Sequence, residues 1–304
     1  MSSLKPSAYR GRFAPSPSGP LHFGSLVAAV GSFLEAHRHQ GQWLVRMEDV
    51  DQPRTVPGAA DAILRTLEAY GFSWEGSVLY QSQRLEAYAD ALARLKASGD
   101  AYPCGCSRKE ISDSGSGHSI DGAPLYPGTC RDGLPPGRQP RAWRLRVPER
   151  EVAFVDLVQG AVCQNLAREV GDFVLLRADG QYAYQLAVVV DDAAQGVTQV
   201  VRGADLLDST ARQIWLQECL GFPPVTYAHL PVATNARGEK LSKQTRAPAL
   251  DDARPVPALW EALAFLGQRP PAELRQGDLA ELWAWAKEHW DLGNVPRQRG
   301  IPLV

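Results

Sequence analysis

The spacing of hydrophobic positions alternates between strand-like and helix-like periods along most of the chain. Residues 9–13 can form a short strand before a turn-rich segment, and apolar positions at helical spacing follow over Leu26–Leu34. Residues 43–48 resemble a second buried strand, and residues 58–70 resemble the next helix. Strands that alternate with helices predict an α/β fold with a parallel sheet, which here begins with a strand, a phosphate-facing loop and a helix.

The regular pattern stops at about residue 102. Gly, Pro, Ser and Cys dominate residues 102–140, and residues 141–147 then alternate like a strand, so residues 102–181 are predicted to form an insertion. An almost continuous apolar run over Tyr182–Val190 predicts a central strand covered on both faces. The chain is therefore expected to re-enter the core sheet at this run.

The remainder of the chain predicts a second half of the sheet and a helical end. Strands are expected at residues 197–202 and 227–232, with a helix from Ser209 to Leu220 between them, and amphipathic segments follow at about 256–267 and 278–289. The expected domains are the first half of the α/β core (1–101), the insertion (102–181), the second half of the core (182–245) and a helical C-terminal region (246–304).

Composition sets wide limits on function. The chain has 304 residues, of which 44% are hydrophobic and 22% charged, as in ordinary globular proteins. Its formal net charge of -2 gives no global attraction to nucleic acid, so any RNA binding must come from local basic patches. The N-terminal residues lack the pattern of a secretory signal, and no run of about 18 apolar residues marks a membrane span, so a cytoplasmic location is expected.

The insertion carries a local excess of arginine. These side chains could face a phosphate backbone, which would make the insertion an RNA contact. The alternation over residues 141–147 fits equally well with arginines on the solvated face of a half-buried strand. The residues concerned are Arg138, Arg141, Arg144, Arg146 and Arg150.

Two short segments suggest phosphate chemistry. His22 and Gly24 lie at the start of the first predicted helix, where unpaired N–H groups and the helix dipole favour an anion. A histidine near a helix start is more often a surface or capping residue, so this segment needs a partner. Lys240 and Lys243 provide one, because a lysine in a loop after a core strand can stabilise charge on a transferring phosphoryl group. A solvated loop is the alternative for the lysines.

The two segments carry a family resemblance. The sequence RFAPSPSGPLHFGS resembles the signature of class I glutamyl- and glutaminyl-tRNA synthetases, with His22–Ser25 in place of the HIGH motif, and Lys240–Gln244 resembles the KMSKS loop. The similarity spans about residues 9–245 and includes LVRMEDVD and VRGADLLD. It implies the class I Rossmann-type parallel sheet, with a zinc-containing insertion and a short helical C-terminal region.

The resemblance also implies residue roles. His22 and Lys243 are expected to be catalytic, and ATP is expected to contact His22, Gly24, Ser25, Lys240, Leu241, Ser242, Lys243 and Gln244. Three positions depart from the family pattern: Ser25 replaces the second histidine, Leu241 a methionine and Gln244 a serine. Because the first histidine and the second lysine remain, amino-acid activation is expected to survive.

Charged residues in these segments suit glutamate, which carries two carboxylates and one ammonium. Arg12 and Arg202 are the candidate carboxylate partners, Glu48 the candidate for the ammonium and Tyr184 a hydrogen-bond donor. Backbone contacts to the substrates are expected from Phe13, Ala14, Pro15 and Ser16. The alternatives are ordinary structural roles: Glu48 and Arg46 as polar residues at a strand end, Arg202 in an ion pair with Asp205, and Tyr184 in the core.

Five cysteines form an odd number, and three of them, Cys104, Cys106 and Cys130, cluster in the insertion. This spacing favours a tetrahedral metal site, most naturally structural zinc, over a disulfide framework. The fourth ligand is open: the family resemblance points to Tyr126, whereas the chemistry of the residues alone would select His118. Three free thiols without metal are the alternative.

The region after the KMSKS-like loop decides which branch of the family the chain resembles. Only about 60 residues follow Lys243, fewer than an anticodon-binding domain needs. They include Trp260, Trp283, Trp285 and Trp290 and resemble the remnant of a helical stem-contact region. The chain therefore resembles the truncated members of the family, which activate glutamate without tRNA and attach it to the queuosine base at the wobble position of tRNA(Asp).

That resemblance implies a ligase whose partners are L-glutamate, ATP with Mg²⁺, and tRNA(Asp) bound through its queuosine-containing anticodon arm; a monomer is expected. Three alternatives are a truncated glutamyl-tRNA synthetase that charges the tRNA(Glu) terminus, another class I adenylate-forming enzyme that loads a small molecule or carrier protein, and a non-catalytic RNA-binding paralogue.

Overall fold

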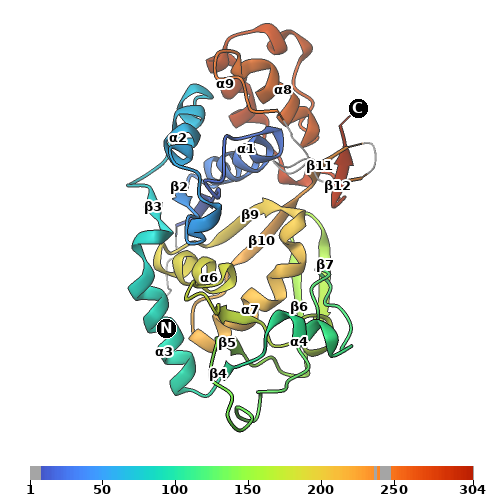
Figure 1. Cartoon of the computed structure of the whole chain (residues 1–304). Helices are drawn as coiled ribbons and strands as arrows, with labels where there is room; N and C mark the ends of the chain where they lie inside the picture. Colours follow the sequence, from blue (N-terminus) through green and yellow to red (C-terminus); the bar gives the residue numbers. More distant parts are fainter. Residues whose placement is uncertain (1–7, 236–237, 240–247, 304) are drawn as a thin grey trace, which may run out of the picture.

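The computed structural model describes residues 8–235, 238–239 and 248–303 (Figure 1). Its first half is built of parallel strands linked by helices: β1 (Arg10–Phe13), α1 (Phe23–Arg38), β2 (Gln42–Met47), α2 (Ala59–Ala69) and β3 (Leu79–Tyr80). The three strands pair in the order β1-β2-β3, and both ladders are parallel. The prediction of a parallel α/β unit at the N-terminal end is confirmed.

The second half adds strands beside β1. β9 (Gln199–Gly203) and β10 (Thr226–Leu230) are parallel neighbours connected through α7 (Thr210–Leu220). The backbone N–H of Thr198, just before β9, donates to the carbonyl of Arg10 at 2.9 Å. The two halves therefore meet at β1 and β9, and the carboxyl ends of both strands lead into the same region.

The predicted central strand over residues 182–190 is wrong, because this run forms helix α6 (Tyr184–Ala194). The helix is covered on most sides: five successive residues from Leu186 to Val190 are buried, as are Asp191 and Asp192. A helix buried all round presents the same unbroken apolar run as a buried strand, so periodicity alone cannot separate the two. The chain returns to the parallel sheet at β9.

The segment between the halves forms two smaller units. An antiparallel sheet has the order β4-β5-β8, and the β6–β7 hairpin joins β10 through one parallel pair, Tyr227 with Asp156. Strand β6 lies within the predicted insertion, residues 102–181, yet it extends the sheet of the second half. The domain boundaries inferred from the sequence stay a prediction. The elements from this segment and the helix before it are α3 (Leu85–Ala97), β4 (Ala101–Cys104), α4 (Arg108–Asp113), β5 (Ala142–Leu145), β6 (Glu151–Asp156), β7 (Gly160–Asn165), α5 (Leu166–Glu169) and β8 (Val174–Leu176).

The two predicted C-terminal helices are confirmed as α8 (Pro255–Phe265) and α9 (Leu279–His289), which lie beyond α1 in Figure 1. They share the core of the first half: the Phe33 and Trp283 rings stack edge to face with centroids 5.1 Å apart. Trp290 is buried, and its indole N–H donates to Glu35 at 2.8 Å. These helices therefore complete the hydrophobic core that contains α1.

The last strand returns to the middle of the molecule. β12 (Gly300–Pro302) pairs in parallel with β11 (Val232–Thr234), the strand that precedes residues 240–247. Short 3-10 turns complete the described elements: Gln52–Arg54, Gln81–Gln83, Ala204–Ser209, Ala272–Gln276 and Leu292–Asn294.

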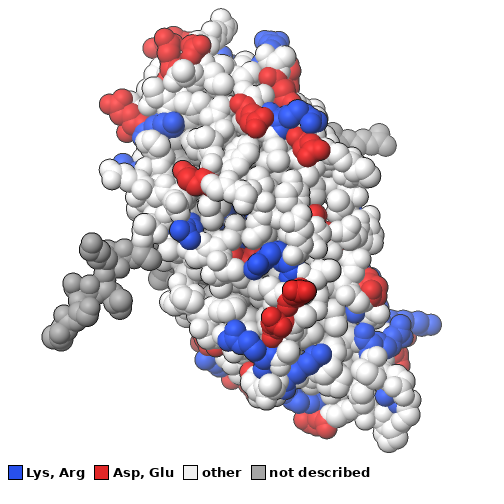
Figure 2. All heavy atoms as spheres, turned by 90° about the vertical axis from the view of Figure 1, so that its left-hand side faces the viewer, with Lys and Arg blue, Asp and Glu red and all other residues white. Residues whose placement is uncertain are grey.

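Two observations bear on binding to membranes and to nucleic acid. Within the described ranges, no helix is both long and apolar enough to cross a membrane. Figure 2 shows a face on which acidic and basic side chains are interspersed, so this face offers no continuous basic surface.

Candidate active site

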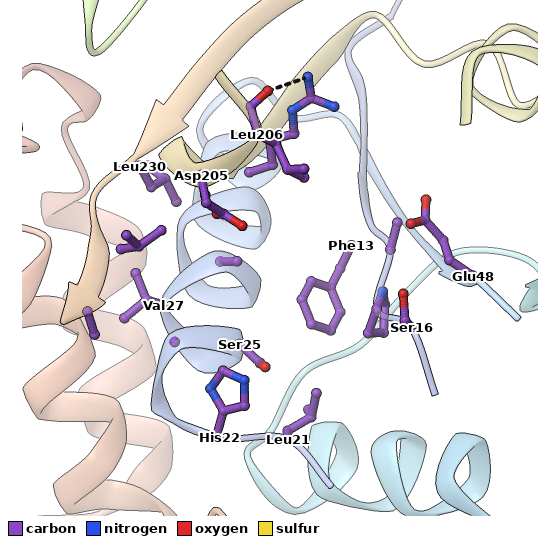
Figure 3. Close-up of a pocket in the computed structure, with 18 of the residues that line it drawn as sticks. Phe13, Ser16, Leu21, His22, Ser25, Val27, Glu48, Asp205, Leu206 and Leu230 are labelled. Carbon is purple, nitrogen blue, oxygen red and sulfur yellow. Dashed lines mark hydrogen bonds between the residues drawn. The ribbon is translucent and has the colours of Figure 1, made fainter. Parts of the chain in front are cut away.

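A cavity of about 810 Å³ lies where the two halves of the parallel sheet meet (Figure 3). Its size is within the range of small-molecule sites, about 300–1,000 Å³. Every described residue that the sequence marked for glutamate or ATP lines it: Arg12, Phe13, Ala14, Pro15, Ser16, His22, Gly24, Ser25, Glu48, Tyr184 and Arg202. The structure thus brings these residues together, while their individual roles stay predictions.

His22 lies at the N-terminal end of α1. Its backbone is extended, with φ -127° and ψ 176°, and the helix begins at Phe23. Gly24 and Ser25 form the first turn, which carries no acidic side chain. The N-terminal end of this 16-residue helix lines the cavity with its positive dipole end, an arrangement that favours a phosphate group.

Lys240, Leu241, Ser242, Lys243 and Gln244 lie outside the described residues. The chain on both sides of them is described, however. Glu239 lines the cavity, and Ala249 forms an isolated antiparallel bridge with His22. The backbone N–H of Leu250 also donates to the carbonyl of Leu21 at 3.0 Å. The chain therefore enters and leaves residues 240–247 beside the cavity.

A buried cluster of charges holds the arginine of β1. The Arg12 Nε and Nη2 atoms lie 3.1 and 3.3 Å from the two carboxylate oxygens of Asp192. Arg46 reaches the same carboxylate at 2.8 Å and reaches Glu48 at 3.3 Å. Two guanidinium groups thus share two carboxylates, and Arg12 and Glu48 of this cluster face the cavity.

Burial dominates the electrostatics of Glu48 and Tyr184. It raises the pKa of the Glu48 carboxyl, although Arg46 and Arg12 oppose the shift. Burial and the Glu48 carboxylate likewise raise the pKa of Tyr184, which keeps the phenol protonated as a hydrogen-bond donor. Tyr184 was expected on a strand; it is the first residue of α6 and nonetheless lines the cavity. An ammonium group beside Glu48 would favour its ionised form.

Arg202, near the end of β9, is only 5% exposed. Its Nη1 donates to Gln213 at 2.8 Å, its Nη2 to Thr210 at 2.9 Å, and its Nε to His229 Nε2 at 3.0 Å. A further, longer contact of 3.4 Å joins Nη2 to the carbonyl of Leu206, which Figure 3 marks with a dashed line. The guanidinium is therefore held on several sides and lines the cavity.

The three clustered cysteines lie together at a distance from this cavity, around strand β4. The Sγ atoms of Cys104, Cys106 and Cys130 are all within 4.8 Å of one another, and Cys106 and Cys130 are 3.7 Å apart. Tetrahedral zinc with Zn–S bonds of about 2.3 Å separates two sulfurs by about 3.8 Å. The 3.7 Å between Cys106 and Cys130 matches this separation, so the cluster is suited to a zinc ion.

Tyr126 completes the cluster geometrically. Its hydroxyl lies 3.4 Å from Cys104 Sγ and 3.8 Å from Cys106 Sγ, and it accepts a 2.9 Å hydrogen bond from the Cys130 N–H. Among the described residues, the candidate metal-binding group contains no histidine, and His118 is exposed. The structure thus brings Tyr126, and not His118, to the three thiols.

The arginines of the insertion are largely engaged within the fold. Arg144 is buried, lies over the Tyr126 ring at 3.9 Å and donates to the carbonyl of Asp172 at 2.8 Å. Arg138 pairs with Glu110 at 2.8 Å, and Arg150 pairs with Glu218. The buried position of Arg144 contradicts both expectations for it, a phosphate contact and a solvated strand face.

Three polar residues around the cavity escaped the sequence analysis. Asp192 gave no signal because the segment before it is predicted as a strand. In a helix that begins at Tyr184, Asp192 lies about two turns after Tyr184, on the same side of the helix. His229 and Asp156 are fully buried and 2.6 Å apart, yet neither strand sequence indicates that the two residues meet. Asp205, which the sequence analysis names as a possible ion-pair partner of Arg202, also lines the cavity.

Comparison with known proteins gives a consistent result. Residues 8–254 match the family model described as tRNA synthetases class I (E and Q), catalytic domain. The chain is 68% identical over 297 residues to the glutamyl-Q tRNA(Asp) synthetase of Dechloromonas aromatica, covering 98% of this chain and 99% of the relative. It is 59% identical over 293 residues to the protein of the same name from Thiobacillus denitrificans, covering 96% and 97%.

Solved structures agree on the fold. The glutamate-tRNA synthetase of Elizabethkingia anophelis superimposes with a TM-score of 0.80 at 24% identity, over 98% of this chain and 68% of that chain. A glutamate tRNA ligase from Elizabethkingia meningosepticum, solved in complex with its amino acid, gives a TM-score of 0.78 at 25% identity, over 96% and 66%.

Proposed function

The chain belongs to the class I tRNA synthetases for glutamate and glutamine, and from this premise we propose that it is a ligase that forms glutamyl-queuosine on tRNA(Asp). It would activate L-glutamate with ATP, without tRNA, and transfer the glutamyl group to the queuosine base at the wobble position. The observation that carries the proposal is that one cavity collects Arg12, Arg202, Glu48 and the N-terminal end of α1. Relatives at 59–68% identity, named glutamyl-Q tRNA(Asp) synthetases, support the acceptor.

Glutamate binding would use opposite charges on one wall of the cavity. Arg12 and Arg202 would pair with carboxylate groups of the substrate, and Glu48 with its ammonium. Tyr184 would donate its phenolic proton to the same ligand. The backbone of Phe13, Ala14, Pro15 and Ser16 would line the passage between the amino acid and the nucleotide. Because glutamine lacks the second carboxylate, two guanidinium groups favour glutamate.

In the activation step, an oxygen of the glutamate α-carboxylate attacks the α-phosphorus of ATP. A new O–P bond forms, the bond from the α-phosphorus to the bridging oxygen breaks, and pyrophosphate leaves, which gives glutamyl-adenylate. His22, Gly24 and Ser25 at the start of α1 would hold the phosphates. Lys243, with Lys240, Leu241, Ser242 and Gln244, would contact the nucleotide, and the Lys243 ammonium would stabilise charge on the α-phosphoryl group. Mg²⁺ would accompany ATP and neutralise the leaving pyrophosphate.

In the transfer step, a hydroxyl of the queuosine cyclopentenediol attacks the carbonyl carbon of the adenylate. An ester bond forms, the bond to the phosphate oxygen breaks, and AMP leaves. The anticodon arm of tRNA(Asp) would dock at the cavity, and the chain would act as a monomer. An enzyme with ATP and tRNA as substrates belongs in the cytoplasm.

Zinc would have a structural role. Cys104, Cys106 and Cys130, with Tyr126 as the fourth ligand, would hold one zinc ion and fix a segment that has only a small apolar cluster of its own. The site would keep the β4–β5 region in shape without taking part in either chemical step.

The first test is glutamate-dependent exchange of pyrophosphate into ATP, measured without tRNA on a panel of amino acids. Exchange with glutamate and little with glutamine or aspartate supports the proposal. Exchange that requires tRNA contradicts tRNA-independent activation, and preference for another acid moves the chain to a different adenylate-forming activity. No exchange with any amino acid would favour the non-catalytic RNA-binding alternative.

A further inference from the structure

His229 connects a buried carboxylate to an arginine of the cavity. It lies on β10 and is fully buried. Its Nδ1 atom is 2.6 Å from Asp156 Oδ2, and its Nε2 atom is 3.0 Å from Arg202 Nε. Asp156 ends strand β6, so three residues from three neighbouring strands form one chain of hydrogen bonds.

The chemistry of the three groups fixes the direction of these bonds. An arginine Nε always carries a hydrogen, so His229 Nε2 must accept from Arg202 and cannot itself be protonated. The proton of the ring then lies on Nδ1, where it is donated to Asp156. Burial lowers the pKa of His229 to about 4, against the attraction of Asp156 and with the repulsion of Arg202. The ring is thus neutral at neutral pH.

Asp156 is suited to orient this ring. Burial would raise its pKa, but the hydrogen bond from His229 and the backbone N–H groups of Gln159 and His229 hold the pKa below its usual range. Asp156 Oδ1 accepts from Val158 and Gln159 at 3.0 and 2.8 Å, and the His229 N–H adds a third bond at 3.1 Å. The carboxylate is therefore fixed and ionised.

We propose that Asp156 and His229 are positioning residues for glutamate recognition, which hold the guanidinium of Arg202 in one orientation toward the cavity. The inference rests on the proposed function, since it takes Arg202 as a partner of a glutamate carboxylate. Asp156 orients the His229 ring, and the ring orients the Arg202 guanidinium. The Asp156 carboxylate itself makes no direct contact with the guanidinium in this chain of hydrogen bonds. Gln213 and Thr210, which also contact Arg202, are neutral acceptors. None of these three acceptors carries a negative charge, so they leave the positive charge of Arg202 available to an anionic substrate.

Two substitutions of His229 separate its contact with Asp156 from its contact with Arg202. In His229→Asn the amide nitrogen can take the place of Nδ1 and donate to Asp156, but the side chain is too short to reach Arg202. In His229→Gln the amide oxygen can take the place of Nε2 and accept from Arg202. We expect His229→Asn to raise the glutamate KM in pyrophosphate exchange about tenfold or more, and His229→Gln to raise it less than about threefold. The ATP KM is expected to stay within about twofold in both.

Equal glutamate KM values in wild type and His229→Asn would overturn the inference, and so would a rise in the glutamate and ATP KM values together. If circular dichroism shows that His229→Asn does not fold, the Asp156→Asn variant is the test instead. The amide oxygen of this asparagine can still accept the backbone hydrogen bonds that Asp156 Oδ1 accepts. A higher glutamate KM in Asp156→Asn supports the inference, and an unchanged one refutes it. Asp172→Asn is the matched control, since Asp172 is a buried carboxylate bonded to the Tyr102 hydroxyl at 2.6 Å and does not line the cavity.

These results are distinguishable from a failure of the proposed function. If the wild-type protein shows no glutamate-dependent exchange, the proposed function fails. If it exchanges normally and the His229 and Asp156 variants keep the wild-type glutamate KM, only the positioning role fails.

Discussion

Arg12 and Asp192 form a two-pronged ion pair, with Nε–Oδ1 and Nη2–Oδ2 distances of 3.1 and 3.3 Å, although 180 residues separate them in the chain. Both side chains are about 5% exposed or less. The pair ties β1, the first strand of the protein, to α6, the helix that precedes β9. It therefore fixes the position of a cavity arginine and joins the two halves at the same time.

Replacing Asp192 with Asn is expected to lower both stability and glutamate affinity. The carboxylate neutralises Arg12 and Arg46 in a buried site, so its loss should cost about 3–5 kcal/mol in the free energy of unfolding. Urea denaturation measures this cost, and Asp252→Asn, at an exposed position, is the control. A loss below about 0.5 kcal/mol in Asp192→Asn, as for ordinary surface changes, would show that the pair is not needed.

The raised pKa of Glu48 predicts a pH dependence of glutamate use. Only the ionised carboxylate attracts the substrate ammonium, and burial makes Glu48 ionise at a higher pH than an ordinary glutamate. As pH falls through this raised pKa, kcat/KM for glutamate should fall, and above it kcat/KM should be level. Steady-state exchange assays across acidic to neutral pH measure the profile. The Glu48→Gln variant should have a lower kcat/KM for glutamate at every pH, without the fall at acidic pH. If the variant shows the same fall, another group causes the pH dependence.

Lys243→Ala is expected to reduce adenylate formation by a factor of about 100 or more, because a cation at the α-phosphoryl group would be lost from the transition state. The melting temperature should not change. Pyrophosphate exchange measures the effect, with Lys109→Ala, an exposed lysine in α4, as the control. Wild-type exchange in Lys243→Ala would exclude a catalytic role for this lysine.

The thiol cluster predicts one zinc ion per chain that depends on Cys104. Cys104→Ser should lower the zinc content measured by elemental analysis, because three closely spaced thiolates become two. Cys163→Ser is the control, since Cys163 is exposed and lies outside the cluster. A Cys104→Ser protein that still holds a full equivalent of zinc would refute the site.

The fourth ligand can be tested separately. Tyr126→Phe is expected to speed the loss of zinc to a chelator, since the Tyr126 hydroxyl lies 3.4 Å from Cys104 Sγ. His118→Ala should have no effect on the rate. The reverse pattern would restore His118 as the ligand.

The sequence predicted the site better than the elements that carry it. His22, Glu48 and Arg202 each lie in or beside a short segment whose local chemistry could be read directly, and all three line the cavity. By contrast, the run over Tyr182–Val190 was assigned to a strand, because valine-rich segments buried on every side lose the contrast between helix and strand periods. Tyr184 nonetheless lines the cavity, because it is the first residue of α6.

What the sequence could not predict are pairings between distant segments. The contact of Asp156 with His229 depends on β6 joining β10, and a single parallel pair is enough to bring the residues together. Similarly, the Asp192 carboxylate meets Arg12 only after α6 has packed against the first strands. Such polar contacts leave no periodic signal, because the two partners lie in different segments and neither segment indicates the other.

Transfer of labelled glutamate to purified tRNA tests the central claim most directly. The protein would be incubated with ATP and Mg²⁺ together with tRNA(Asp) that contains queuosine, tRNA(Asp) that lacks it, or tRNA(Glu). Label on queuosine-containing tRNA(Asp) alone is the predicted result. Label on tRNA(Glu), at its terminal adenosine, would contradict the claim and identify the chain as a compact charging enzyme.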